Sequence, residues 1–112
     1  MTAPTELDRY TLVLLRRPSD APDLPEAELD RLQEAHLAHL DSLREHGLLV
    51  AGPFLDQEDD SLRGMCLFHG TAERVRELMA ADPSVQAGRL RPDVLTWLTR
   101  KGALRLGESG SS

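Results

Sequence analysis

The sequence predicts a single α+β domain whose strands and helices follow the order β-α-β-β-α-β. Short apolar runs, each bounded by glycine, proline or acidic residues, are typical of strands. Longer stretches with leucine or valine at helical spacing alternate with these runs and indicate amphipathic helices. The length of 112 residues and the absence of an internal repeat or linker favour one domain. We expect that domain to span residues 1–106, followed by a flexible tail at 107–112 that is rich in glycine and serine.

The first strand and the first helix open the domain. Residues 10–16 are apolar at both alternating sets of positions, which predicts a strand buried on both faces, although a buried helix can have the same pattern. After a turn-rich loop at 17–24, Pro25 suits the first turn of a helix over residues 26–46. Gly47 is expected to end this helix as its C′ residue.

Two strands follow in the middle of the chain. Residues 48–51 and 62–69 are short apolar runs on either side of a hydrophilic turn at 56–61, which predicts a strand for each run. Gly64 lies inside the second of these runs and indicates a bulge or a close backbone approach.

The last helix and the last strand complete the pattern. Thr71 is a good N-cap residue for a helix over residues 72–81, and Asp82, which precedes a proline, ends this helix. Residues 84–88 are expected to form a short turn of helix or a loop, and residues 94–98 are expected to form the fourth strand.

This order of elements is that of a ferredoxin-like protomer with an antiparallel sheet, the split β-α-β arrangement. Such a sheet carries its helices on one face only. Because the strand at 10–16 is apolar on both faces, the second face also needs a cover. In so short a chain a second copy is the simplest cover, and we therefore expect a homodimer whose sheets pack face to face.

One histidine occupies an unusual place in the predicted first helix. At about 100° per residue, His36 lies at the centre of an apolar stripe of four leucines, Leu29, Leu32, Leu40 and Leu43. Burying an imidazole without a partner costs on the order of 1–3 kcal/mol. The ring is therefore expected either to be satisfied locally or to serve a function.

Composition and charge exclude several classes of function. The net charge of −6 argues against binding to nucleic acid. A single cysteine excludes an intrachain disulfide and fits a reducing compartment. No apolar stretch is long enough to span a membrane and the N-terminus has no signal-peptide core, so we expect a cytoplasmic protein. The chain has no phosphate loop, Rossmann fingerprint or serine nucleophile elbow, and no cofactor is expected.

Several short motifs also share the order and the spacing of a known family. They are His36-Leu37-Ala38-His39-Leu40, then Gly47 eleven residues after His36, then Ala51-Gly52-Pro53, Ala81-Asp82-Pro83-Ser84-Val85 and Gly88. Over residues 10–97 the chain resembles the YciI-like, or YCII-related, family. The resemblance implies a dimeric α+β barrel and a proposed site built around His36 and Asp82. A few members of that family are dehydrochlorinases of chlorinated hydroxyquinol-type aromatics, and structurally related families include muconolactone isomerases and cofactor-free monooxygenases.

These observations support three hypotheses about function. The first is a small cofactor-free enzyme, a lyase or isomerase acting on a small cyclic or aromatic acid, with His36 as general acid and base and Asp82 orienting its ring. The second ring nitrogen would then face a cavity lined by the first and third strands. The alternatives are a non-catalytic module that binds a small molecule, and a dimerisation module in which His36 is a satisfied core residue and Asp82 is only a cap or turn residue.

Two other histidines are weaker candidates. His39 lies about 60° from His36 at the edge of the stripe, where it either lines a pocket mouth or, as we favour, is solvated. His46 adjoins the end of the helix and is expected to complement the helix dipole. His36 and His39 could share a metal ion, but neither a cysteine nor an HExxH pattern supports this, and no metal is expected.

The remaining candidates are assigned to packing or to the surface. Cys66 alternates with apolar residues in a strand and is expected to be a buried hydrophobe rather than a nucleophile. Arg16 and Arg17 end the first strand and could meet an anionic substrate, although surface arginines are the simpler interpretation. Trp97 is expected to serve packing rather than to stack on a ligand.

Overall fold

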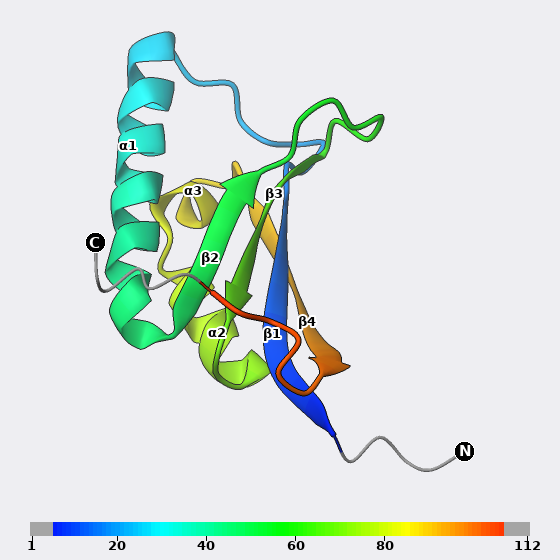
Figure 1. Cartoon of the computed structure of the whole chain (residues 1–112). Helices are drawn as coiled ribbons and strands as arrows, with labels where there is room; N and C mark the ends of the chain where they lie inside the picture. Colours follow the sequence, from blue (N-terminus) through cyan, green and yellow to red (C-terminus); the bar gives the residue numbers. More distant parts are fainter. Residues whose placement is uncertain (1–5, 107–112) are drawn as a thin grey trace.

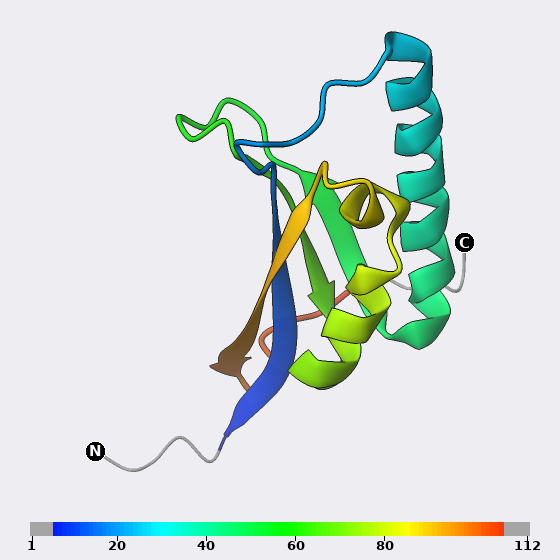
Figure 2. The same ribbon diagram turned by 180° about the vertical axis from the view of Figure 1, so that it is seen from behind.

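The computed structural model describes residues 6–106 and shows a four-stranded antiparallel sheet with all of its helices on one face (Figures 1 and 2). The elements in chain order are β1 (Leu7–Arg16), α1 (Glu26–Ser42), the 3-10 helix η1 (Leu43–His46), β2 (Leu48–Pro53), β3 (Leu62–Phe68), α2 (Ala72–Ala80), α3 (Pro83–Gln86) and β4 (Arg91–Arg100). The strands lie in the order β2-β3-β1-β4. The predicted α+β class and the antiparallel sheet are confirmed, whereas the dimeric barrel stays a prediction.

Strand β1 lies inside the sheet, between β3 and β4. Its position explains why both of its alternating sets of side chains are apolar. One set pairs with the helix-facing residues of β3, as in Val13 opposite Cys66, and the other set pairs with residues of the open face, as in Leu12 opposite Leu67. A central strand contributes to both surfaces of the sheet, so its sequence shows no polar alternation.

Helix α1 begins and ends almost as the sequence indicates. Pro25 precedes it and two glutamates occupy its first turn, where they complement the helix dipole. The prediction of one continuous helix to His46 needs a correction, because the last turn is a separate 3-10 helix. Gly47 follows with a φ of 103°, and a Cβ atom there would lie 2.5 Å from the carbonyl oxygen of His69. The close approach and the left-handed backbone both require glycine, which confirms its predicted place.

The outer part of the sheet is longer than predicted. Strand β4 spans Arg91–Arg100 rather than 94–98, and β1 starts at Leu7 rather than at residue 10, because the two strands pair from Leu7 opposite Arg100 to Arg16 opposite Arg91. Pro92 lies within β4. A proline is tolerated there because β4 is an edge strand, in which one side of the backbone needs no donor.

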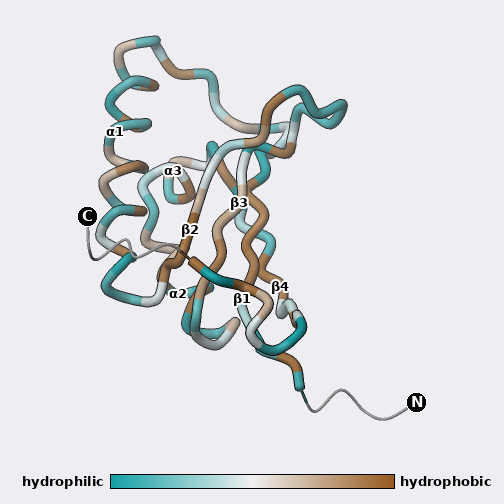
Figure 3. Tube along the Cα trace, in the orientation of Figure 1, coloured by the Kyte–Doolittle hydropathy of each residue, from teal (hydrophilic) through white to brown (hydrophobic). Residues whose placement is uncertain are grey.

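The core lies between the sheet and the helices. It contains ten buried residues from the covered face of the sheet, η1, α2 and the segment before β4: Val13, Leu15, Leu43, Leu48, Cys66, Phe68, Val75, Leu78, Met79 and Leu90. Figure 3 shows that hydrophobic residues are concentrated along the strands, whereas α1 alternates between hydrophilic and hydrophobic positions. Helix α1 therefore contributes less to the core than its leucine stripe suggests.

The opposite, open face of the sheet also carries apolar side chains. Leu95, Val50 and Trp97 on this face remain 47%, 47% and 39% exposed. After β4 the chain turns back, and residues 103–106 cross part of this face (Figures 1 and 2). The predicted tail at 107–112 lies outside the described residues. Within the described range, none of the helices has the length and apolar character needed to cross a membrane.

Candidate functional site

His36 is the one buried residue of helix α1, with 7% of its surface exposed. The leucines of its stripe at positions 29, 32 and 40 are only half-buried. The reason is the position of α1, which contacts the short helix α3 and η1 (Figure 2). The polar ring, rather than the neighbouring leucines, is thus the part of α1 that is most completely enclosed.

Asp82 is the partner of this ring. His36 Nδ1 lies 2.6 Å from Asp82 Oδ2, and the aspartate is fully buried. The second oxygen, Oδ1, accepts a hydrogen bond of 2.9 Å from the backbone N–H of Ser84. Asp82 is therefore the N-cap of α3, as is typical of an aspartate just before a proline at the first helical position. The cap and the contact with His36 use different oxygens of one carboxylate.

The cap orients the carboxylate, and the carboxylate in turn defines the state of the ring. A carboxylate can only accept, so Nδ1–H of His36 donates the hydrogen bond to Asp82. In the neutral imidazole, Nε2 then carries a lone pair and no proton. No hydrogen-bond partner of Nε2 is found among residues 6–106, and the side chain remains 10% exposed. This geometry leaves Nε2 able to accept or donate a proton.

Cys66 lies on the covered face of the sheet close to this pair. It is fully buried, and burial together with the nearby charge of Asp82 raises the pKa of its thiol to about 12. At neutral pH the group is therefore a neutral thiol rather than a thiolate, which is the reactive form. This environment agrees with the expectation of a buried hydrophobe.

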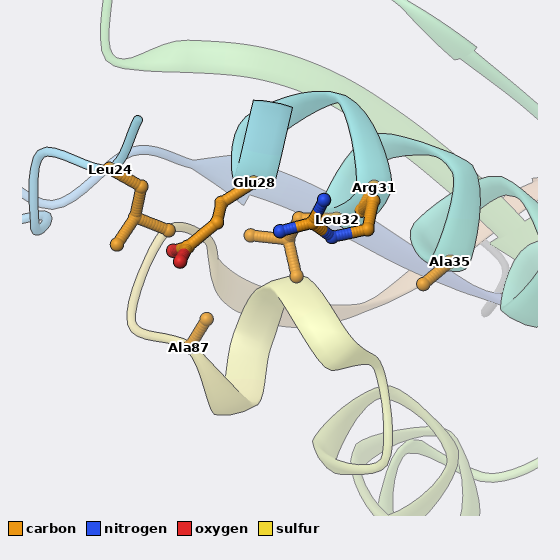
Figure 4. A pocket seen from close by; sticks show the side chains of 6 residues that line it. All are labelled: Leu24, Glu28, Arg31, Leu32, Ala35 and Ala87. Carbon is orange, nitrogen blue, oxygen red and sulfur yellow. The ribbon is translucent and has the colours of Figure 1, made fainter. Parts of the chain in front are cut away.

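An open pocket of about 400 Å³ lies between α1 and the end of α3 (Figure 4), and neither His36 nor Asp82 is among its lining residues. Its lining residues come from the loop before α1, from α1 and from the end of α3: Leu24, Glu28, Arg31, Leu32, Ala35 and Ala87. The expectation of a cavity lined by the first and third strands is not met by this pocket. The helix-facing side chains of those strands are packed into the core instead, and the open space lies where α1 stands over α3.

His39 and His46 take separate places. His39 is half-buried, and its Nε2–H donates to the carbonyl oxygen of Leu78 over 2.9 Å, so the prediction of a solvated ring is wrong. His46 is exposed at the last position of η1. His36 and His39 thus bind different partners. In residues 6–106 no group of three or more histidine, cysteine, aspartate or glutamate side chains is arranged to hold a metal ion.

Arg16 lies at the charged end of β1, close to two aspartates. Arg16 forms ion pairs with Asp93 at 2.7 Å and with Asp59 at 3.4 Å. Ser61 and Arg16 together lower the pKa of Asp59. Trp97 lies on the open face, where its ring centroid is 6.1 Å from that of Tyr10, so it packs within the sheet surface while remaining partly exposed.

Two parts of the site were not predicted from the sequence. One is Ser84, whose backbone N–H fixes the carboxylate of Asp82; the Asp-Pro-Ser sequence was its signal, because an aspartate there is a common N-cap. The other is the pocket formed by Leu24 and Ala87 with α1. No local pattern predicts it, since its walls come from segments far apart in the chain.

Solved structures of other proteins are similar to the chain, and the first of them, with a TM-score above 0.5, shares its fold. The first is 5-chloro-2-hydroxyhydroquinone dehydrochlorinase from Burkholderia phenoliruptrix, in complex with 2,5-dihydroxybenzoquinone; it is 21% identical, with a TM-score of 0.56, over 79% of this chain and 92% of that one. A solution structure of the Arabidopsis thaliana protein At3g17210 matches at 17% identity and a TM-score of 0.42, over 90% of this chain and 96% of that one.

At the level of sequence, no curated protein matches the chain. The model of one protein family does match it. The YCII-related domain aligns with residues 10–98, which include all four strands nearly complete, both main helices, and the His36 and Asp82 pair. The match covers most of the chain. This chain therefore belongs to the family of YCII-related domain proteins.

Proposed function

We propose that the chain is a small-molecule enzyme of the lyase or isomerase type, in which His36 transfers protons and Asp82 orients the ring. The observation that carries the proposal is the buried hydrogen bond of 2.6 Å between His36 Nδ1 and Asp82 Oδ2. A carboxylate held on Nδ1 stabilises the imidazolium that forms when Nε2 takes a proton. His36 and Asp82 together thus act as a general acid and base, with His36 carrying the proton.

The substrate we propose is a small cyclic or aromatic compound with an acidic group. A YCII-related domain and the fold of a dehydrochlorinase support this class. In the loss of HCl from a chlorinated hydroxyhydroquinone, Nε2 of His36 would accept a proton from one hydroxyl and return it to the ring carbon that bears chlorine, which gives a ketone. The hydroxyl para to the first then loses its proton, and its electrons pass through the ring to expel chloride from that carbon. The products are a quinone, chloride and a proton, so the step needs no external oxidant. Isomerisation of a related ring would use the same proton transfer.

To test this, the purified chain is incubated with 5-chloro-2-hydroxyhydroquinone, the compound in the name of the similar dehydrochlorinase, and the release of chloride is measured. His36→Gln keeps a polar side chain but cannot carry a proton, and we expect it to lower kcat/KM by about 10²–10⁴. His39→Gln is the matched control in the same helix, because the ring of His39 hydrogen-bonds to a backbone carbonyl rather than to Asp82. It should keep the activity.

The alternative of a non-catalytic binding module makes a different prediction. In that case a bound aromatic acid would show no turnover, and His36→Gln would change its affinity without changing any rate. Equal activity of His36→Gln and the unchanged chain would defeat the catalytic proposal, provided that circular dichroism shows both to be folded.

We also propose that the chain forms a homodimer through the open face of its sheet. Val50, Leu95 and Trp97 expose large apolar side chains there. A specific dimer would bury at least about 1,200 Å² in total. Light scattering should give twice the mass of 12.4 kDa at micromolar concentration, and Trp97→Glu should give the mass of one chain. A monomer in both cases would refute the dimer.

A further inference from the structure

Three arginines meet at one end of the sheet. Arg17 directly follows β1, Arg63 lies near the start of β3, and Arg89 lies just before β4. Because β1 lies between β3 and β4, these three positions are neighbours across the sheet. The backbone agrees with this placement, since Arg16 pairs with Leu62 on one side and with Arg91 on the other.

No carboxylate neutralises this cluster within residues 6–106. The arginines that form ion pairs there are Arg16, Arg44, Arg74 and Arg91. Arg89 Nη1 donates to the carbonyl oxygen of Pro22 over 2.8 Å, and Arg63 Nη1 donates to that of Asp60 over 3.2 Å. A guanidinium has five N–H donors. Most of the donors of the cluster are thus left for another acceptor.

Arg17 is the most constrained member of the cluster. Its Nε–H is buried and has no hydrogen-bond partner in the described part of the chain. A buried donor without an acceptor is unfavourable by about 1–3 kcal/mol. Burial, together with the positive charges of Arg89 and Arg63, lowers the pKa of Arg17. Its neighbour Arg16 shows the opposite arrangement, with two aspartates in contact.

We propose that Arg17, Arg63 and Arg89 form a binding site for a small oxyanion, such as the carboxylate of an organic acid or a phosphate group. An oxyanion there would accept from the free guanidinium N–H groups of the cluster and offset the repulsion among the three charges. Guanidinium groups bind carboxylates and phosphates with two parallel hydrogen bonds, which is why an oxyanion is the class of ligand proposed.

The site adjoins the pocket between α1 and α3. Pro22, which Arg89 binds, is two residues before Leu24 in the pocket wall, and Ala87 of the same wall is two residues before Arg89. The backbone N–H of Arg89 also donates to the carbonyl oxygen of Ser84, the residue that fixes Asp82. Glu28 is the one carboxylate in the pocket lining, and it forms no ion pair with the cluster. A ligand anchored by its acidic group would extend its body into this pocket.

The test measures the melting temperature in sodium phosphate and, separately, in 4-hydroxybenzoate, with sodium chloride keeping the ionic strength constant. Binding to the folded state predicts a saturable rise of about 5 °C or more at ten times the Kd. Arg17→Gln should lose this rise. Arg76→Gln is the charge-matched control, because Arg76 is exposed on α2 and should leave the rise intact.

Two further measurements make the result decisive. Without added oxyanion, Arg17→Gln should melt no lower than the unchanged chain, since it removes a charge that repels two others; this also shows that the variant folds. A rise with 4-hydroxybenzoate identifies an organic acid as the ligand, and a rise with phosphate alone identifies a phosphate group. No saturable rise with either anion, or an equal rise in Arg17→Gln, overturns the proposal. The same titration in His36→Gln separates this site from the proposed catalysis.

Discussion

The two faces of the sheet are both apolar, yet several large side chains of the open face are far more exposed than those under the helices. On the covered face, Val13, Cys66 and Phe68 are fully buried under the helices. On the open face, Leu95 and Trp97 remain 47% and 39% exposed. The same alternation in β1 supplies both faces. The sequence of β1 therefore shows that both sets of its side chains are apolar. Which element covers each set depends on the rest of the fold.

The faces differ also in where polar groups are placed. Under the helices, the ring of His36 and the carboxylate of Asp82 satisfy each other in a buried contact. At one end of the open face, Arg16 is paired with Asp93 and Asp59, which are partly or largely exposed. Buried polar groups have a greater effect on stability because water cannot replace a lost partner. Substitutions on the covered face should therefore lower stability more than those on the open face, and four measurements test this difference.

The largest effect is expected from a pair of matched truncations. Phe68→Ala removes a fully buried ring and should lower the free energy of unfolding by about 3–5 kcal/mol. Trp97→Ala on the open face removes a larger ring that is 39% exposed, and should cost no more than about 2 kcal/mol in the separate protomer. Urea denaturation at several protein concentrations measures both. If the cost of Trp97→Ala grows with concentration, the open face is covered by a second copy.

The second effect concerns Asp82. Asp82→Ala leaves both the ring of His36 and the backbone N–H of Ser84 without an acceptor, and should cost about 2–4 kcal/mol. Asp82→Asn keeps an oxygen for Ser84 but turns an amide donor towards the ring. Nδ1 must then accept, so the proton should move to Nε2 of His36.

Nitrogen NMR of the imidazole rings detects this change of tautomer. His39 is the internal reference, because its Nε2–H donates to the carbonyl oxygen of Leu78 in either variant. If His36 has the same tautomer in Asp82→Asn as in the unchanged chain, Asp82 does not orient the ring.

The sequence was most informative for features that depend on neighbours in the chain. Gly47 and the Thr71 cap follow from local backbone chemistry, and the structure confirms both. The ends of β1 and β4 were misplaced because their outer residues are held by pairing with each other rather than by apolar burial. Helical spacing alone identified His36 as a buried polar group. His39 was misjudged, since its partner is a backbone carbonyl of another helix, which no spacing predicts.

The third effect depends on pH and isolates Cys66 on the covered face. Burial and the charge of Asp82 raise the pKa of this thiol from 9.0 to about 12. Between these values the folded chain keeps the proton that the unfolded chain releases, so stability should fall as pH rises from about 9 to 12. The slope from this group is at most about 1.4 kcal/mol per pH unit. Cys66→Ala should show a shallower decline over the same range. Parallel curves would mean that the thiol is solvated.

The smallest effect is expected at the ion pair of the open face. Arg16 and Asp93 are 28% and 38% exposed in their side chains, so water already screens their attraction. Asp93→Asn should therefore lower the free energy of unfolding by only about 0.2–1 kcal/mol, and 1 M salt should remove most of the difference. Arg17, one residue further, gives the contrast: it has no carboxylate partner in the described chain, and its replacement by glutamine should cost nothing. A loss of several kcal/mol in Asp93→Asn would show that this end of the open face is shielded from water, as a partner protomer packed against it would do.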